Sequence, residues 1–230
     1  MQPQLIREKV KIPASDGALA GELTYPFEGT TFAALIVNPH PHMGGRTGNR
    51  LLVQLAEALA DGGGVVLSFD YSGVGESDGP RVDVAESMSQ FWKTGSAPED
   101  PRMVDDAHHA IAWMTKTTTL PLMVVGYSFG AYAATLALTD AVDALVLISP
   151  TIKQHDFARL QSQSLAKLVV YSDNDFATPQ SNLETWLTEF PQPLETCRIP
   201  SGDHFFRGHE NAVANACLSF TEQLSGVALV

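Results

Sequence analysis

The feature that most restricts the fold is a regular alternation of short apolar runs with amphipathic segments. Runs rich in β-branched residues are typical of strands buried on both faces of a parallel sheet. They span residues 33–37, 65–69, 122–125, 144–148 and 168–171, with a last strand expected at 195–199. Segments with helical character alternate with them, at residues 50–60, 103–115, 129–138, 181–189 and 210–224. This order predicts an α/β fold, a mostly parallel sheet flanked by helices, with functional loops at the carboxyl ends of the strands.

The chain begins with a predicted hairpin, in which residues 7–12 and 18–25 are joined by a turn that ends in Asp-Gly. No internal repeat or low-complexity linker divides the sequence, so we expect residues 1–230 to form a single domain. Residues 79–101 break the even spacing. This Pro- and Gly-bounded segment is too long for a simple connector and is a candidate cover for a site.

Charge and cysteine content exclude several classes of protein. The formal net charge is −12 with no run of Lys or Arg, which gives no basic surface for nucleic acid or an anionic membrane. No window approaches the roughly 18 apolar residues of a membrane span. Cys197 and Cys217 are too few for a disulfide framework and lack the spacing of a zinc or C-x-x-C motif. We therefore expect a soluble, cytoplasmic protein that binds neither nucleic acid nor membrane.

The strongest sign of chemistry is a G-x-S-x-G motif, residues 126–130, between the apolar run 122–125 and the helical segment that follows. A serine on such a sharp strand-to-helix turn presents its hydroxyl to solvent near a helix N-terminus, where backbone N–H groups favour developing negative charge. We therefore predict that Ser128 is a nucleophile. A Gly-Ser turn that only caps the helix is the alternative.

A serine hydroxyl needs a base and an orienting acid. Asp175 follows the strand at 168–171 and is our predicted acid, with Asp173 as its rival in a turn-forming role. His204 follows the last strand and is our predicted base, whereas His209 lies at the start of the last helix. The order Ser, Asp, His is that of the α/β-hydrolase arrangement.

An oxyanion hole needs two backbone donors, one of them from the residue after the nucleophile, here Phe129. The second is expected from residues 38–45, N-P-H-P-H-M-G-G. Proline has no N–H, so the first well-placed donor is His42, with Met43 second. His40 and His42 also raise the possibility of a metal site, but two histidines at i, i+2 without a third ligand are weak evidence for zinc, and we predict no metal.

Together these motifs resemble the α/β-hydrolase superfamily, and more narrowly its small, capless serine hydrolases related to dienelactone hydrolases and short-chain carboxylesterases. The resemblance also includes the turn D-Y-S-G-V-G-E-S after the fourth strand, D-x-x-T-P at Asp175 and G-D-H-F-F at His204. It implies an eight-stranded sheet with an antiparallel second strand, and the roles predicted above for Ser128, Asp175, His204, Phe129 and His42. Dienelactone hydrolases themselves use cysteine where this chain has serine.

We therefore expect a serine hydrolase that cleaves short-chain carboxylic esters through an acyl-enzyme, without a cofactor. Residues 149–166, where larger relatives insert a lid, hold at most a short helix, which favours an open site and short acyl groups. The candidate substrate-binding residues are Met43, Phe91, Trp92, Phe205 and Phe206. Core packing is the alternative role of the aromatic residues. A thioesterase, an amidase or an acyltransferase would use the same acyl-enzyme, and a ligand-binding homologue without turnover also stays open.

Overall fold

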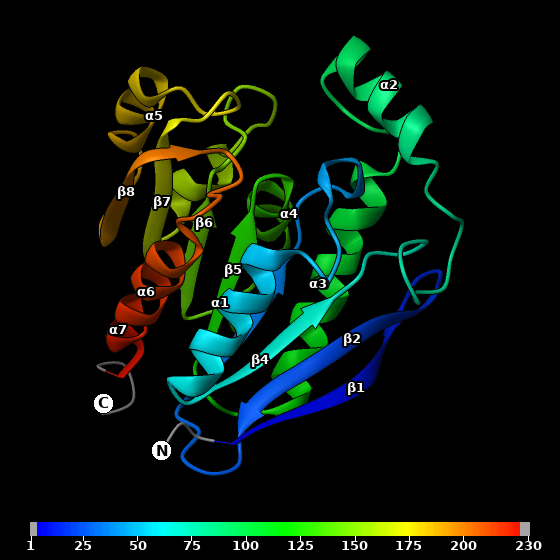
Figure 1. Ribbon diagram of the computed structural model, residues 1–230, viewed down its shortest axis with the longest axis vertical. Helices are drawn as coiled ribbons and strands as arrows, with labels where there is room; N and C mark the ends of the chain where they lie inside the picture. The colour runs from blue at the N-terminus through cyan, green and yellow to red at the C-terminus, as the bar shows by residue number, and fades with distance from the viewer. Residues whose placement is uncertain (1–3, 226–230) are drawn as a thin grey trace.

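The computed structural model describes residues 4–225 of the 230-residue chain. Within them lies an eight-stranded sheet in the order β1-β2-β4-β3-β5-β6-β7-β8 (Figure 1). The strands are β1 (Leu5–Ala14), β2 (Gly17–Pro26), β3 (Phe32–Val37), β4 (Gly64–Phe69), β5 (Leu122–Tyr127), β6 (Ala144–Ile148), β7 (Ala166–Asn174) and β8 (Leu194–Asp203). β2 is antiparallel to β1 and β4, and the pairs from β4 to β8 are parallel. The predicted sheet, including its antiparallel second strand, is confirmed.

Helices cover both faces of the sheet. They are α1 (Arg50–Asp61), α3 (Asp100–Thr117), α4 (Phe129–Ala137), α5 (Gln180–Leu187), α6 (Glu210–Phe220) and α7 (Glu222–Ser225). Successive strand residues point to opposite faces, so Ile36 packs in the cluster formed with α1 and α6, while Leu35 packs in the cluster formed with α3 and α4. The two apolar layers hold the parallel strands rigidly and leave their carboxyl ends free to carry loops.

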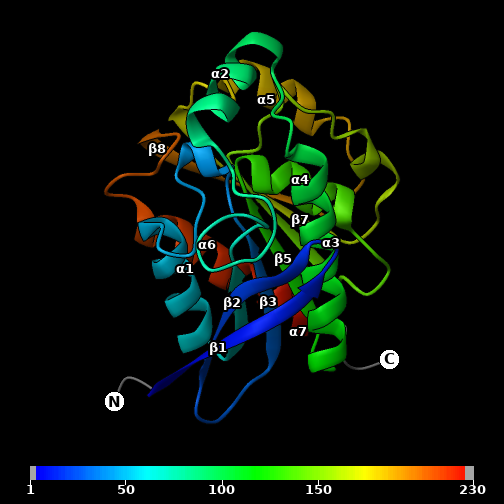
Figure 2. The same cartoon turned by 90° about the vertical axis from the view of Figure 1, so that its right-hand side faces the viewer.

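The main difference from the sequence-based expectation is α2 (Val84–Thr94), which lies within the segment 79–101. Figures 1 and 2 show it standing beyond the carboxyl ends of the strands, apart from the sheet. The Asp83 carboxylate begins the helix by accepting hydrogen bonds from the amides of Ala85 and Glu86. Gly95, with φ of 79°, ends it in the left-handed conformation.

The last predicted helix, residues 210–224, is interrupted at Thr221. The Thr221 hydroxyl and its amide both donate to the Leu218 carbonyl, and this local bonding replaces the regular helical pattern. The interval at 149–166 holds only the short 3₁₀ helix η2 (Ala158–Ser162), in line with the expectation of a minimal lid. Over residues 4–225, no helix has the length and apolar character needed to cross a membrane.

Candidate active site

Ser128 stands between β5 and α4 in a strained conformation, with φ of 56° and ψ of −120°. The turn is so tight that neighbouring positions have no room for a side chain. A Cβ on Gly126 would lie 2.6 Å from the Ala131 Cα, and one on Gly130 would lie 2.5 Å from the Asn38 carbonyl oxygen. The glycines of the G-x-S-x-G motif are therefore required by close backbone packing, and that packing holds Ser128 at the carboxyl edge of the sheet.

The structure brings Ser128, His204 and Asp175 together from the ends of β5, β8 and β7. Ser128 Oγ lies 3.0 Å from His204 Nε2, and His204 Nδ1 lies 2.8 Å from Asp175 Oδ1. All three side chains are buried. Asp173, the rival acid, instead accepts a hydrogen bond from Arg198 Nε at 2.6 Å.

The Asp175 carboxylate is held in its charged form. Burial raises its pKa, but the hydrogen bond and charge interaction with His204, together with the Ser149 hydroxyl and the Ala177 amide, lower it below its usual value. Oδ1 also accepts hydrogen bonds from Ala177 N at 2.8 Å and Thr178 N at 3.2 Å. Because an ionised Oδ1 can only accept, His204 Nδ1 carries the proton and Nε2 is left as the acceptor for the Ser128 hydroxyl.

The two candidates for the second oxyanion donor, His42 and Met43, lie in the 3₁₀ turn η1 (Pro41–Met43), which follows β3. Met43 N, ranked behind His42 from the sequence, donates to the His40 carbonyl at 2.8 Å, so this amide is used within the turn. His42 N makes a longer hydrogen bond, 3.3 Å, to His40 Nδ1. A bond of that length to a side chain is weak and exchangeable, which leaves His42 N the better donor in this turn.

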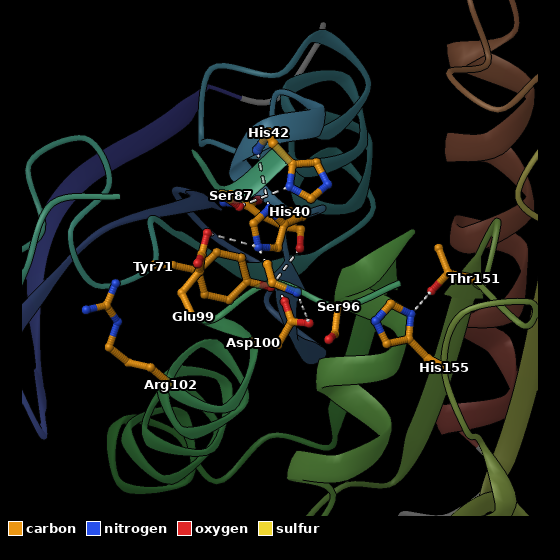
Figure 3. Close-up of polar contacts among 12 residues, drawn as sticks. His40, His42, Tyr71, Ser87, Ser96, Glu99, Asp100, Arg102, Thr151 and His155 are labelled. Carbon is orange, nitrogen blue, oxygen red and sulfur yellow. Dashed lines mark hydrogen bonds and ion pairs between the residues drawn. The ribbon is translucent and has the colours of Figure 1, made fainter. Parts of the chain in front are cut away.

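His40, which the sequence analysis considered only as a weak candidate metal ligand, is buried beside the proposed oxyanion donors (Figure 3). Its Nδ1 accepts the His42 amide, so in the neutral ring Nε2 carries the proton; Nε2 faces Glu99 Oε1 at 3.6 Å and Asp100 Oδ1 at 3.4 Å. Its ring lies against the His42 ring with centroids 3.9 Å apart and planes tilted by 32°, and it meets Phe129 edge-on at 5.2 Å. His40 therefore contacts both residues predicted to donate to the oxyanion.

The His42 ring connects this turn to α2. Its Nδ1 lies 3.2 Å from Ser87 Oγ, and its ring centroid is 4.9 Å from that of Phe91. Burial, and next the charge interaction with His40, lower the pKa of His42 to about 4, although Asp100 acts in the opposite direction. The ring is thus neutral near pH 7. Ser87 and Phe91 thus join α2 to the turn that carries His42.

A cavity of about 150 Å³ opens beside Ser128 and His204. Of the candidate substrate-binding residues, Met43, Phe91 and Trp92 line it. The structure does not bring Phe205 into the lining; the Phe205 ring packs edge-on against His204 at 5.4 Å and lies under the guanidinium of Arg207. Phe206 is fully buried in the core.

The remaining lining residues were not identified from the sequence; apart from His40 they are Asp100, Thr151, Lys153, Gln154, His155, Phe176 and Ala177. They come from loops after β6 and β7 and from the start of α3. Among them, His155 is partly buried, and its Nδ1 lies 2.8 Å from the Thr151 hydroxyl oxygen (Figure 3). Burial lowers the pKa of the His155 ring. Over residues 4–225, no group of three or more His, Cys, Asp and Glu side chains is arranged to hold a metal ion.

Comparisons with known proteins agree with this architecture. Residues 44–198 match the profile of the hydrolase family described as serine aminopeptidase, S33. An uncharacterized protein from Rickettsia prowazekii is 25% identical over 186 residues, covering 76% of this chain and 71% of the relative.

Solved structures share the fold, and two of them are hydrolases of similar length. One is a serine hydrolase without a lid from Xanthomonas campestris, with a TM-score of 0.77, 23% identity and coverage of 94% of each chain. The other is a dienelactone hydrolase from Anabaena variabilis, with a TM-score of 0.75, 20% identity and coverage of 97% of this chain and 99% of that chain. The predicted resemblance to small, capless α/β hydrolases is confirmed.

Proposed function

The chain belongs to the S33 serine aminopeptidase family of hydrolases, and from that premise we propose that it cleaves carboxylic esters with a small acyl group through an acyl-enzyme on Ser128. The observation that carries the proposal is the continuous series of contacts from Asp175 Oδ1 through the His204 ring to Ser128 Oγ, at 2.8 and 3.0 Å. Both distances are within hydrogen-bond reach, as general-base activation of a serine requires.

In the proposed mechanism His204 Nε2 takes the Ser128 proton while Oγ attacks the ester carbonyl carbon. The ionised Asp175 stabilises the resulting imidazolium, and the amides of Phe129 and His42 donate to the tetrahedral oxyanion. His204 then gives its proton to the leaving alcohol oxygen, which leaves the acyl group bonded to Oγ. Water, deprotonated by the same ring, releases the carboxylic acid and restores Ser128.

The size of the cavity supports a small acyl group. A volume of about 150 Å³ is close to that of a cavity that holds a single benzene molecule. Short aliphatic acyl groups fit within that volume, and Phe91 and Phe129 provide apolar walls for them. A small-molecule ester is therefore the substrate class that we assign.

The test is covalent labelling together with kinetics. Incubation with a fluorophosphonate should add one adduct, mapped by mass spectrometry to the peptide that contains residues 126–130. Ser128→Ala should abolish the label and lower kcat/KM for p-nitrophenyl acetate by about 10⁴-fold or more. The control Ser181→Ala changes an exposed serine on α5 and should keep both the label and the wild-type kcat/KM. Wild-type turnover by Ser128→Ala would refute the mechanism.

A second candidate, amide cleavage, is favoured by one observation besides the family description. Asp100 is a nearly buried carboxylate in the cavity lining, and Oδ1 retains lone pairs beyond its 3.4 Å contact with His40 Nε2. An anion in this position suits the ammonium group of an aminoacyl substrate. A panel of p-nitrophenyl esters, acyl-CoA thioesters and aminoacyl anilides separates the candidates, since an aminopeptidase would prefer the anilides and lose that preference in Asp100→Asn.

A further inference from the structure

Exposed apolar side chains are concentrated at one place on the protein. In the described part of the chain the exposed large hydrophobic residues are Phe27, Val84, Met88, Trp92 and Phe176. Three of the five lie on α2, and Phe176 and Trp92 both line the catalytic cavity. Scattered exposed apolar residues are normal, but a continuous group beside a cavity indicates a binding surface.

The three residues on α2 form a stripe, which we call the α2 stripe and define as Val84, Met88 and Trp92. They are four positions apart, so they follow one side of the helix over about 12 Å. At about 100° per residue, Val84 and Met88 fall between Phe91 and Trp92 around the helix axis. Phe91 and Trp92 both line the cavity, so the stripe continues, along α2, the side of the helix that borders the cavity at Trp92.

The helix is held in this orientation from its inner side. Ser87 and Phe91 contact His42, and Ser87 is buried, whereas Trp92 is 69% exposed. The outer part of the stripe therefore has no partner within residues 4–225 that hides it from solvent. Figure 2 shows α2 raised above the rest of the molecule at this end of the sheet.

The stripe also borders the cavity in which the alcohol is released, because Trp92, Phe176 and His204 all line it. In the proposed mechanism the leaving oxygen takes its proton from His204. The Phe176 ring, half exposed, packs on the His204 ring with centroids 4.7 Å apart and lines the same cavity. Trp92 lines this cavity too, and the stripe extends from Trp92 along α2, so the leaving alcohol lies in the cavity that one end of the stripe borders.

We propose that the ester substrate has an extended apolar alcohol portion, and that this hydrocarbon chain binds along the α2 stripe while the small acyl group occupies the cavity. The inference rests on the proposed function. An uncharged chain also agrees with a protein of formal net charge −12, which does not attract anionic partners. The alcohol is thus selected by a surface outside the cavity, and the acyl group by the cavity itself.

The experiment compares two isomeric esters of equal hydrophobicity, hexyl acetate and ethyl hexanoate, with ethyl acetate as the reference. All are used below their solubility limits, and acid release is followed in a pH-stat. A methylene of which half is buried raises kcat/KM about twofold, so four additional methylenes on the alcohol should raise it about 16-fold. Ethyl hexanoate should show no such gain.

The variant Val84→Gln/Met88→Gln keeps good helix-forming residues while removing the apolar surface. We expect its ratio of kcat/KM for hexyl acetate over that for ethyl acetate to fall from about 16 to below about 3. The matched control is Phe27→Gln, an equally drastic change at a residue that is 72% exposed. Phe27 follows β2, which is antiparallel to β4, so it lies at the opposite edge of the sheet and its variant should keep both the rates and the ratio.

Two results would overturn the inference. One is a ratio that is the same in the wild type and the double variant, and the other is a preference for ethyl hexanoate. If the unchanged ratio comes with a loss of self-association in the double variant, measured by light scattering, a second copy of the chain covers the stripe instead. If Ser128 is labelled by the fluorophosphonate and ethyl acetate is hydrolysed, these results refute only the proposed binding of the hydrocarbon chain along the α2 stripe. If neither occurs, the proposed function fails and the inference fails with it.

Discussion

The substitution Asp175→Asn separates two effects of a carboxylate beside an imidazole, namely fixing the tautomer and stabilising the imidazolium. In this protein Oδ1 accepts from His204 Nδ1 at 2.8 Å and also from the amides of Ala177 and Thr178, at 2.8 and 3.2 Å. A carboxamide that keeps its oxygen in this position satisfies all three donors. The flipped amide would direct its N–H groups at two backbone N–H groups. We therefore expect the substituted side chain to keep the oxygen toward His204 and preserve the tautomer.

The expected loss is then mainly the attraction between the carboxylate and the imidazolium. For unit charges about 4 Å apart at an effective dielectric constant of about 20, this attraction is ~4 kcal/mol. Such a loss in the transition state lowers kcat/KM by about 10³-fold. Asp175→Ala removes the acceptor as well, leaves two buried amides unpaired and frees the ring to rotate, so its loss should be about 10⁴-fold or more.

The assay is kcat/KM for p-nitrophenyl acetate, combined with the ¹⁵N chemical shifts of the His204 ring, which report the tautomer directly. Asp173→Asn is the matched control, because Asp173 is an adjacent acid that pairs with Arg198, and its variant should stay within about twofold of the wild type. A His204 ring in Asp175→Asn that carries its proton on Nε2 would refute the argument from the two amides. A wild-type rate would refute the role of Asp175 altogether.

Two further predictions concern stability. Gly130→Ala should lower the free energy of unfolding by about 1–3 kcal/mol in urea titrations, because its Cβ would lie 2.5 Å from the Asn38 carbonyl oxygen; Gly48→Ala, with no atom within 4 Å of the added Cβ, is the neutral control. The pKa of His42 is lowered to about 4, chiefly by burial, so between pH 6.5 and 4 the unfolded chain binds more protons than the folded one and stability falls as the pH falls. His42→Gln should reduce that loss in urea titrations at pH 7, 5.5 and 4.5, and an unchanged pH dependence would contradict the assigned pKa.

Most of the sheet could be predicted from the sequence because its strands are buried on both faces. In β3 and β5 every residue is buried, so the apolar runs coincide with the elements. The boundaries were less predictable where burial ends. β8 continues to Asp203, well beyond the expected end at 199, through residues whose side chains are largely exposed and leave no apolar pattern.

The three residues proposed for catalysis could be selected because each one follows a strand, and parallel strands end at the same edge of the sheet. The cavity wall could not be predicted in the same way. Phe205 and Phe206 are adjacent to His204, yet neither lines the cavity, whereas Phe176 does. The orientation of a side chain within a loop depends on backbone turns that have no sequence period. Phe206, with φ of 51°, lies in such a turn.

α2 and the turn that carries His42 act as one unit, because Ser87 and Phe91 contact the His42 ring. A hydrocarbon chain bound along the α2 stripe would therefore also steady a proposed oxyanion donor. Binding energy that improves the transition state raises kcat, whereas contacts made equally in the ground state lower KM only. We thus expect hexyl acetate to exceed ethyl acetate in kcat, and Ser87→Ala to remove that gain while the lower KM remains. An advantage of hexyl acetate in KM alone would show that the stripe binds the chain without influencing the donor.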